Sequence, residues 1–301
     1  GELGVIFDPR HPGPGLRILR VIPETPADRV ASRLFPGDLL LAVNGEPVER
    51  GADPARLLDG TVDRKVLLTV RGDGGRQREV ALRPCSGREF REALDREAME
   101  ARRRYVDRAG GGRLAYLEIE SMDIGSLEEF ERELYAVAHG REALLIDVRG
   151  NPGGWITDLL LASLLTPEHA QTVPRGGRPA YPQDRRLLYA WTKPIVVLCD
   201  EYSYSNAEIF SWAVKTLKRG PVVGRRTYGA VISTGGMTLL DGSSLRLPGR
   251  GWITRFDGSN QEGTGCPPDI EVEIRPGEIA LGIDRQLEAA VAEGLRQLPG
   301  R

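Results

Sequence analysis

The chain has 301 residues and a formal charge of −2, from 41 Lys and Arg against 43 Asp and Glu. This balance disfavours nucleic acid as a partner, and no apolar run approaches the roughly 20 residues that cross a bilayer. The length is enough for about two domains, each with a core of its own. We therefore expect a globular protein without nucleic-acid or membrane partners.

The cysteine pattern argues against two kinds of stabilising site. Cys85, Cys199 and Cys266 are odd in number and widely spaced, with no CxxC pair or Cys/His cluster. Neither a disulfide framework nor a zinc site is expected from such a pattern. The sequence also has no motif for an organic cofactor, so we expect neither cofactor nor metal.

Residues 1–84 alternate short apolar runs with turn signals, which is typical of a small β-rich module. Asn44-Gly45 is a strong signal for a tight turn between two strands. The pattern predicts strands at 3–7, 16–21, 39–43, 66–71 and 78–82, and short helices at 26–34 and 54–58.

This module resembles a PDZ domain in three segments. They are Glu2-Leu3-Gly4-Val5, Thr25-Pro26-Ala27 and the run from Pro36-Gly37-Asp38 to Asn44-Gly45-Glu46-Pro47-Val48. The resemblance implies that Leu3, Gly4 and Val5 bind a peptide, whose terminal carboxylate accepts backbone hydrogen bonds while the strand pairs with it. A purely structural spacer is the alternative.

The next residues change in character. Residues 86–108 are rich in Arg and Glu and have few apolar positions, which predicts a connecting helix with a solvated surface. Gly110-Gly111-Gly112 ends it. We therefore assign residues 85–112 to a linker.

From Arg113 onward, buried strands alternate with helices, which predicts an α/β layered domain over residues 113–301. Ligands of such domains bind at the carboxyl ends of the strands. The expected strands are 114–120, 143–148, 194–199 and 221–224; the helices are 127–138, 155–165, 205–217 and 282–297; and a hairpin joins 237–240 to 244–247 through Asp241-Gly242.

Two junctions between a strand and a helix carry candidate chemistry. In Asp147-Val148-Arg149-Gly150-Asn151-Pro152-Gly153-Gly154-Trp155, paired glycines can direct N–H groups at an oxyanion; a tight turn that needs glycine is the alternative. After the strand ending at Cys199, a serine at position 205 would sit on a sharp turn with its Oγ exposed. An N-cap serine is the alternative there.

Together, and in this order, the two segments resemble peptidase family S41, which includes the C-terminal processing proteases and the tricorn core protease. The family has a ClpP/crotonase-like fold, often with a PDZ-like module before the protease core, so the resemblance covers nearly the whole chain. It implies hydrolysis of peptides through an acyl-enzyme on Ser205. Gly154 and Asn206 would donate N–H groups to the oxyanion, and Gly153 would lie beside the substrate.

The branch of the family depends on the general base. Gly224-Arg225-Arg226-Thr227-Tyr228-Gly229-Ala230 resembles the segment of the processing proteases that ends in a catalytic lysine, but here the last residue is Ala230. The tricorn branch instead uses a histidine and a downstream glutamate. Gln261-Glu262-Gly263-Thr264-Gly265 resembles the glutamate segment, which implies that role for Glu262; a solvated loop carboxylate is the alternative.

The chain departs from the tricorn pattern at two points. The pattern has its histidine in a helical subdomain before the PDZ-like module, whereas His11, His139 and His169 are all expected at the surface. Without a general base a serine hydroxyl is a poor nucleophile, so activity requires a base from missing sequence or another subunit. Thr172 stands where the pattern has an aspartate that selects basic side chains, so we expect a neutral or apolar preference.

We therefore expect a tricorn-like serine peptidase that acts on peptide substrates. By resemblance alone it would form a homo-oligomeric ring in the cytoplasm; the processing branch would argue for the periplasm. A non-catalytic PDZ peptide-binding protein with a degenerate protease domain is the main alternative. An acyl-CoA enzyme of the crotonase type is a third.

Overall fold

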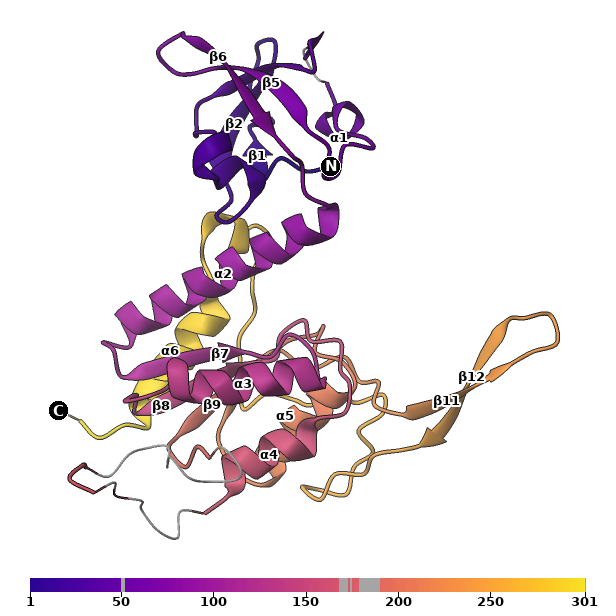
Figure 1. Cartoon of the computed structure of the whole chain (residues 1–301). Helices are drawn as coiled ribbons and strands as arrows, with labels where there is room; N and C mark the ends of the chain where they lie inside the picture. The colour runs from indigo at the N-terminus through magenta and orange to yellow at the C-terminus, as the bar shows by residue number, and fades with distance from the viewer. Residues whose placement is uncertain (50–51, 168–172, 174, 179–189, 301) are drawn as a thin grey trace. The chain divides into compact units, whose positions relative to one another are not determined.

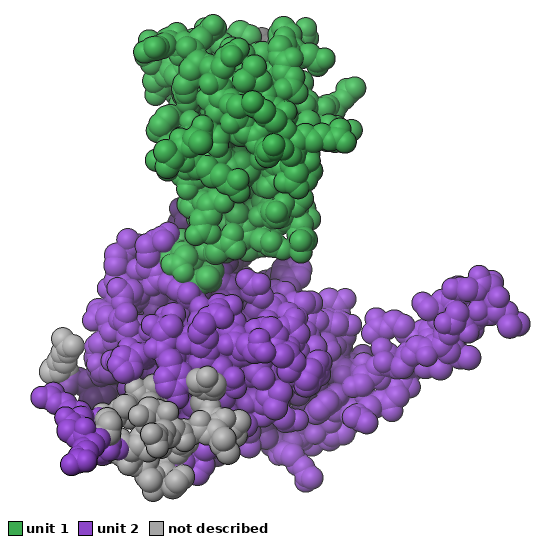
Figure 2. Space-filling view, in the orientation of Figure 1, with its two compact units in different colours: residues 1–101 green, residues 102–301 purple. Residues whose placement is uncertain are grey.

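The computed structural model describes residues 1–49, 52–167, 173, 175–178 and 190–300. It divides into two compact units, Gly1–Ala101 and Arg102–Arg301 (Figures 1 and 2), each with its own sheet and buried core. The division falls inside one helix, so the limits 1–84, 85–112 and 113–301 stay predictions. No helix within the described ranges is long and apolar enough to cross a bilayer.

The first unit is built on a six-stranded antiparallel sheet in the order β1-β2-β3-β5-β6, with β4 paired to β3. Alternating apolar residues place side chains such as Ile18, Leu40 and Leu68 in its core, which is the period expected of half-buried strands. The expected strands are confirmed with small changes at their ends. Their bounds are β1 Val5–Phe7, β2 Leu16–Val21, β3 Leu39–Val43, β4 Glu46–Pro47, β5 Val66–Arg71 and β6 Gln77–Leu82.

The local turn signals of this unit are confirmed. Asn44 and Gly45 both have positive φ, 51° and 84°, and join β3 to β4. The short helix α1 (Pro54–Leu57) is capped by Asp53, whose Oδ1 accepts the Ala55 N–H at 2.9 Å. These features depend on neighbouring residues alone, which is why the sequence predicted them.

The helix predicted at 26–34 is wrong. The segment forms two 3₁₀ turns, Pro26–Asp28 and Val30–Ser32. The Ala27 N–H donates to Leu3 O and the Ala27 carbonyl accepts from the Leu34 N–H, both at 2.9 Å. A continuous α-helix would instead pair the Ala27 carbonyl with the N–H group four residues on, and Arg29, with φ −66° and ψ 139°, is extended between the two turns.

The connecting helix is confirmed as α2, Gly87–Ala109. At its start the Ser86 N–H and hydroxyl both donate to Glu89 Oε2 at 2.7 Å. Beyond its end, Gly111 and Gly112 have positive φ, 60° and 72°, a conformation that favours glycine.

The second unit has a parallel five-stranded sheet in the order β13-β10-β9-β8-β7. The strands are β7 Leu114–Glu118, β8 Ala143–Asp147, β9 Ile195–Cys199, β10 Val222–Gly224 and β13 Ile270–Glu271. The last was not predicted, because two residues make no apolar run. A separate hairpin is formed by β11 (Ser233–Thr238) and β12 (Ser244–Arg250).

Helices cover both faces of this parallel sheet (Figure 1). Leu144 and Ile146 of β8 share a core with the helices α3, α4 and α5. Leu145 of the same strand points to the opposite face, where Gly294 of α6 packs against it. The helix bounds are α3 Ile124–Ala136, α4 Thr157–Leu165, α5 Asn206–Thr216 and α6 Arg285–Arg296.

A buried ion pair fixes the carboxyl end of β8. Arg149 Nη2 lies 2.7 Å from Asp147 Oδ2, and Arg149 Nη1 lies 2.9 Å from Asp284 Oδ1, just before α6. Burial raises the pKa of the Asp147 carboxyl, but the Arg149 charge and hydrogen bonds from Arg149 and Tyr116 outweigh it, so the pKa is lowered. Asp147 is therefore a buried carboxylate with strong partners.

Asp147→Asn is expected to lower the free energy of unfolding by about 3–5 kcal/mol, because it leaves Arg149 buried without that countercharge. The folded pKa of Asp147 is lowered, so its contribution is complete above the unfolded pKa of about 3.9 and is lost as pH falls through the folded value. Urea unfolding at pH 7 and at acid pH measures the loss of stability in the variant and its dependence on pH. The control Glu129→Gln breaks the exposed pair with Arg132 and should leave the free energy of unfolding nearly unchanged. Equal losses in the two variants would contradict the assignment.

Candidate active site

The glycine and serine segments meet at the carboxyl ends of β8 and β9, which are neighbouring parallel strands. A Cβ placed on Gly153 would lie 2.7 Å from Ser205 Cβ and 3.0 Å from the Asn206 nitrogen. The turn after β8 therefore packs directly on Ser205. Only glycine allows this approach, because Gly153 also has a φ of 90°.

Ser205 itself is on a strained turn. Its φ is 54° and its ψ −115°, a region that residues other than glycine rarely adopt. Ser205 does occupy the N-cap position of α5, but N-cap residues ordinarily have extended backbone angles. The sharp turn expected from the sequence is therefore present, and capping alone does not account for it.

Gly154 follows Gly153, and its N–H group has no hydrogen-bond acceptor among the described residues. Its φ is 148°, and a Cβ there would lie 2.0 Å from Met122 O. On either side, the Met122 N–H donates to Gly153 O at 3.0 Å and the Trp155 N–H donates to Met122 O at 2.8 Å. Within the described part of the chain, the N–H groups of Gly154 and Asn206 donate no hydrogen bond. Both can therefore be offered to an oxyanion.

Two asparagines hold these loops in place. Asn151 Oδ1 accepts the Gly153 N–H at 2.8 Å, and its Nδ2 donates to Ile119 O at 2.6 Å. Asn206 Oδ1 accepts the Thr157 N–H at 3.0 Å at the start of α4. Side-chain hydrogen bonds thus tie the turn that carries the glycines to Ile119, and tie the start of α5 to the start of α4.

The structure adds Glu208, which the sequence analysis did not single out. Its side chain is fully buried and accepts four hydrogen bonds. Oε1 accepts the N–H groups of Ser205 at 3.0 Å and Ala230 at 2.9 Å; Oε2 accepts the Thr227 hydroxyl at 2.6 Å and the Gly229 N–H. The spacing Ser205-x-x-Glu208 is that of a capping box, a signal that could have identified it.

Glu262 is tied to the same loop one step farther along. Its Oε2 accepts the N–H groups of Val231 at 2.7 Å and Ile232 at 2.9 Å. Its Oε1 has no hydrogen bond to any described residue, so one carboxylate oxygen is available. The structure therefore brings Glu262 to the loop that Glu208 holds, with no hydrogen bond between Glu262 and Ser205.

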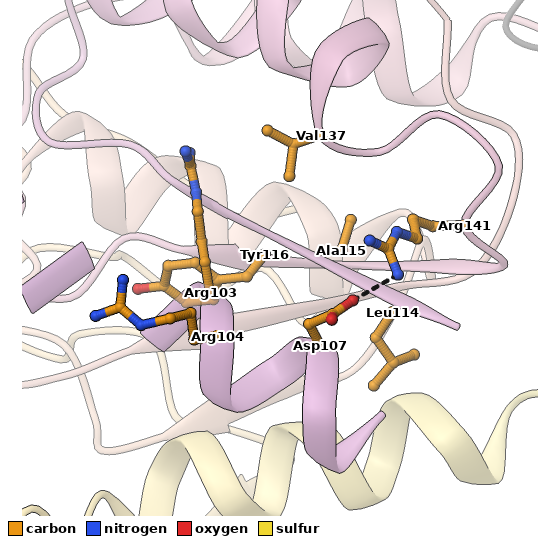
Figure 3. Close-up of a pocket in the computed structure, with 8 residues that line it drawn as sticks. All are labelled: Arg103, Arg104, Asp107, Leu114, Ala115, Tyr116, Val137 and Arg141. Atoms are coloured by element: carbon orange, nitrogen blue, oxygen red, sulfur yellow. Dashed lines mark hydrogen bonds and ion pairs between the residues drawn. The ribbon is translucent and has the colours of Figure 1, made fainter. Parts of the chain in front are cut away.

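Two cavities lie apart from these residues. One, of about 230 Å³, is at the amino end of β7, opposite to the end at which Ser205 lies (Figure 3). Its charges are largely paired within the unit, with Asp107 2.7 Å from Arg141 and Arg103 bound to Glu133. The other, of about 220 Å³, lies in the first unit and is lined by Glu2, Leu3, Val5, Ile6, Phe7, Asp53, Pro54, Ala55 and Leu58.

The predicted peptide-binding residues are placed around that second cavity. Leu3 and Val5 line it, and β1 is an edge strand of the sheet. Gly4 does not line it; its φ is 91°, and a Cβ there would meet the Thr25 hydroxyl at 2.0 Å. Gly4 thus shapes the turn that presents the strand edge.

Comparisons with known proteins point in one direction. The model of peptidase family S41 matches residues 113–272, and a PDZ domain model matches residues 17–72. The chain belongs to peptidase family S41.

This S41 chain is similar to "Tricorn protease homolog 1" of Streptomyces coelicolor, with 36% identity over 96% of the chain and 27% of that protein. It is 30% identical to "Tricorn protease" of Thermoplasma acidophilum over 87% of the chain and 24% of that protein. A crystal structure of the tricorn protease superposes on 99% of the chain and 29% of that protein's chain, with a TM-score of 0.84 and 26% identity. The chain spans about a quarter of the length of these relatives.

The described residues of this S41 chain do not place a base on Ser205. Ala230, at the lysine position of the processing proteases, donates to the same Glu208 oxygen as the Ser205 N–H. Lys215 is held elsewhere, 2.8 Å from Asp269 Oδ1. His139 is exposed just beyond the end of α3. His169 and Thr172 lie outside the described residues.

A matched pair of variants tests the role of the Glu208 carboxylate. Glu208→Gln should lower the free energy of unfolding by about 2–5 kcal/mol, because Gln has one acceptor oxygen and leaves buried donors unpaired. Glu262→Gln should cost under about 1 kcal/mol, since one amide oxygen can still accept both N–H groups. Thermal and urea unfolding measure the two losses. If the Glu208→Gln protein is as stable as the Glu262→Gln protein, the Glu208 carboxylate does not stabilise the fold through its four hydrogen bonds.

Proposed function

We propose that this chain is the nucleophile-bearing part of a tricorn-like serine peptidase, which hydrolyses peptides through an acyl-enzyme on Ser205. The observation that carries the proposal is the left-handed turn at Ser205, beside two N–H groups that no described residue uses. A hydroxyl raised on such a turn next to paired donors is suited to attack a carbonyl.

In this mechanism Ser205 Oγ attacks the substrate carbonyl carbon, and the N–H groups of Gly154 and Asn206 stabilise the oxyanion. One such donor is typically worth about 10²–10³ in rate. The hydroxyl proton passes to a general base and then to the leaving amine; water afterwards hydrolyses the acyl-enzyme. The base is a histidine from outside the described residues or from another subunit. The free Oε1 of Glu262 is available to a polar network around it.

The same proposal covers the substrate preference, the oligomeric state and the cellular location. Gly153 and Thr172 line the substrate site, and a neutral or apolar side chain is preferred. Tyr228 supports this preference: the residue is 63% exposed, and its ring packs edge-on against the ring of Tyr204, the residue before Ser205, with the ring centroids 5.1 Å apart. We also propose a homo-oligomer and a cytoplasmic location.

The experiment is labelling with a fluorophosphonate, followed by mass spectrometry to locate the adduct. We expect the adduct on Ser205 and none in Ser205→Ala. If the chain alone lacks the base, the labelling rate rises with pH without a plateau. A histidine base within the chain or its oligomer gives an inflection near about pH 6.5.

Two outcomes decide the proposal. An adduct on Ser205 with either pH profile supports it, and the profile then reports where the base is. No adduct on Ser205 at any pH, in a protein whose thermal unfolding matches that of Ser205→Ala, contradicts the proposed nucleophile.

For the first unit we propose that the groove between β1 and α1 binds the carboxyl-terminal end of a peptide. The apolar lining by Leu3 and Val5 and the open edge of β1 support this, because an extended peptide can add a strand there. Fluorescence anisotropy with a peptide library should give binding for free carboxylates and at least about tenfold weaker binding for the amidated forms. Equal affinities would contradict capture of the carboxylate.

A further inference from the structure

The β11–β12 hairpin is unusual in being exposed along its whole length. Every residue from Ser233 to Gly251 is exposed. Among the described residues, the two strands pair with each other and with no other strand, and Figure 1 shows them as a separate hairpin. An isolated two-stranded hairpin is at best marginally stable in water, and its open edges can pair with another chain. No described residue therefore covers this hairpin arm, whereas helices cover the parallel sheet of the same unit.

The hairpin arm has two different faces. Cross-strand pairing places Met237 opposite Leu245 and Gly235 opposite Leu247, so these side chains share one face. The other face is polar, and Arg246 there donates to the Thr234 hydroxyl at 2.8 Å. The apolar face, as we call it, comprises Met237, Leu239, Leu245 and Leu247, whose side chains are 41–48% exposed.

Opposite charges stand at the two ends of the hairpin arm. Asp241 is in the turn at the tip, where its Oδ1 accepts from Ser243 and its Oδ2 has no partner among the described residues. At the base, a bulge pairs Arg250 with Ser233, in line with Gly235 and Met237. The bulge thus turns Arg250 onto the apolar face, and it has no ion pair within the described ranges.

We propose that the hairpin arm is a dimerisation element, in which two copies of this chain pack their apolar faces together, antiparallel, about a two-fold axis. The midpoint between Asp241 and Arg250 falls beside Leu245, at the centre of the apolar face. The two-fold axis therefore places apolar side chains against apolar side chains. It also places Asp241 of each copy beside the Arg250 of the other, a charge complementarity that favours a second copy as the occupant.

Analytical ultracentrifugation of the 301-residue chain from low to high micromolar concentration tests this contact. We expect a monomer–dimer equilibrium. Asp241→Arg and Arg250→Asp should each weaken dimerisation at least about tenfold, because like charges then meet at both ends. An equimolar mixture of the two variants should recover the dimer, since unlike charges meet at both ends of the mixed pair.

Neighbouring residues on opposite faces supply the matched control. Leu245→Lys should abolish the dimer, whereas Ser244→Lys, on the polar face, should leave it intact; circular dichroism verifies that both proteins fold. A wild-type chain that is monomeric throughout overturns the proposal. So does a dimer that survives Leu245→Lys, or a mixture of charge variants that does not recover association.

Discussion

The backbone of Ser205 is the constraint on which the candidate site depends. A residue with a side chain held in this region costs about 1–3 kcal/mol, so surrounding contacts must hold it there. Glu208 accepts its N–H group, and Gly153 packs against its Cβ without a side chain of its own. The strained backbone is therefore held from two sides, by a carboxylate of the helix that Ser205 caps and by a glycine of the turn that follows β8.

The segment 147–154, which supplies the glycine, is held by buried side-chain interactions. Asp147 and Arg149 join the end of β8 to Asp284 at the start of α6, and Asn151 bonds to both Ile119 and Gly153. The order Asp-x-Arg-x-Asn-x-Gly-Gly thus reads as a series of structural requirements. Two charged residues fix where the turn begins, an amide fixes its path, and two glycines allow it to approach Ser205.

Much of this could be predicted because it depends on neighbouring residues. Leu16–Val21, Leu39–Val43 and Val66–Arg71 were predicted as strands because each is a short apolar run bounded by turn signals, and the sequence shows that directly. The segment 26–34 is not a continuous helix, because Arg29 is extended and the Ala27 carbonyl accepts from Leu34, features that the helical spacing of its apolar residues does not show.

The same limit applies to the candidate site. Ser205-x-x-Glu208 is a local spacing, but the other donors to Glu208 lie about twenty positions farther along the chain. For the hairpin, the sequence pattern indicates burial that the structure does not show. Alternating Met237, Leu245 and Leu247 indicate a half-buried sheet, and only the fold shows that nothing among the described residues covers them.

Glu208 and Glu262 hold the loop that connects the candidate site to the hairpin arm. Glu208 holds Gly229 and Ala230, Glu262 holds the next two residues, and β11 begins immediately after them at Ser233. The loop beside Ser205 is therefore fixed by buried or half-buried carboxylates before the chain enters the exposed strands. Because these bonds do not involve the hairpin, the turn at Ser205 is preorganised whether or not the hairpin is covered. Energetic coupling between the turn at Ser205 and the hairpin arm would require a second conformation of residues 229–232. The four backbone hydrogen bonds from these residues to carboxylate oxygens disfavour such a second conformation.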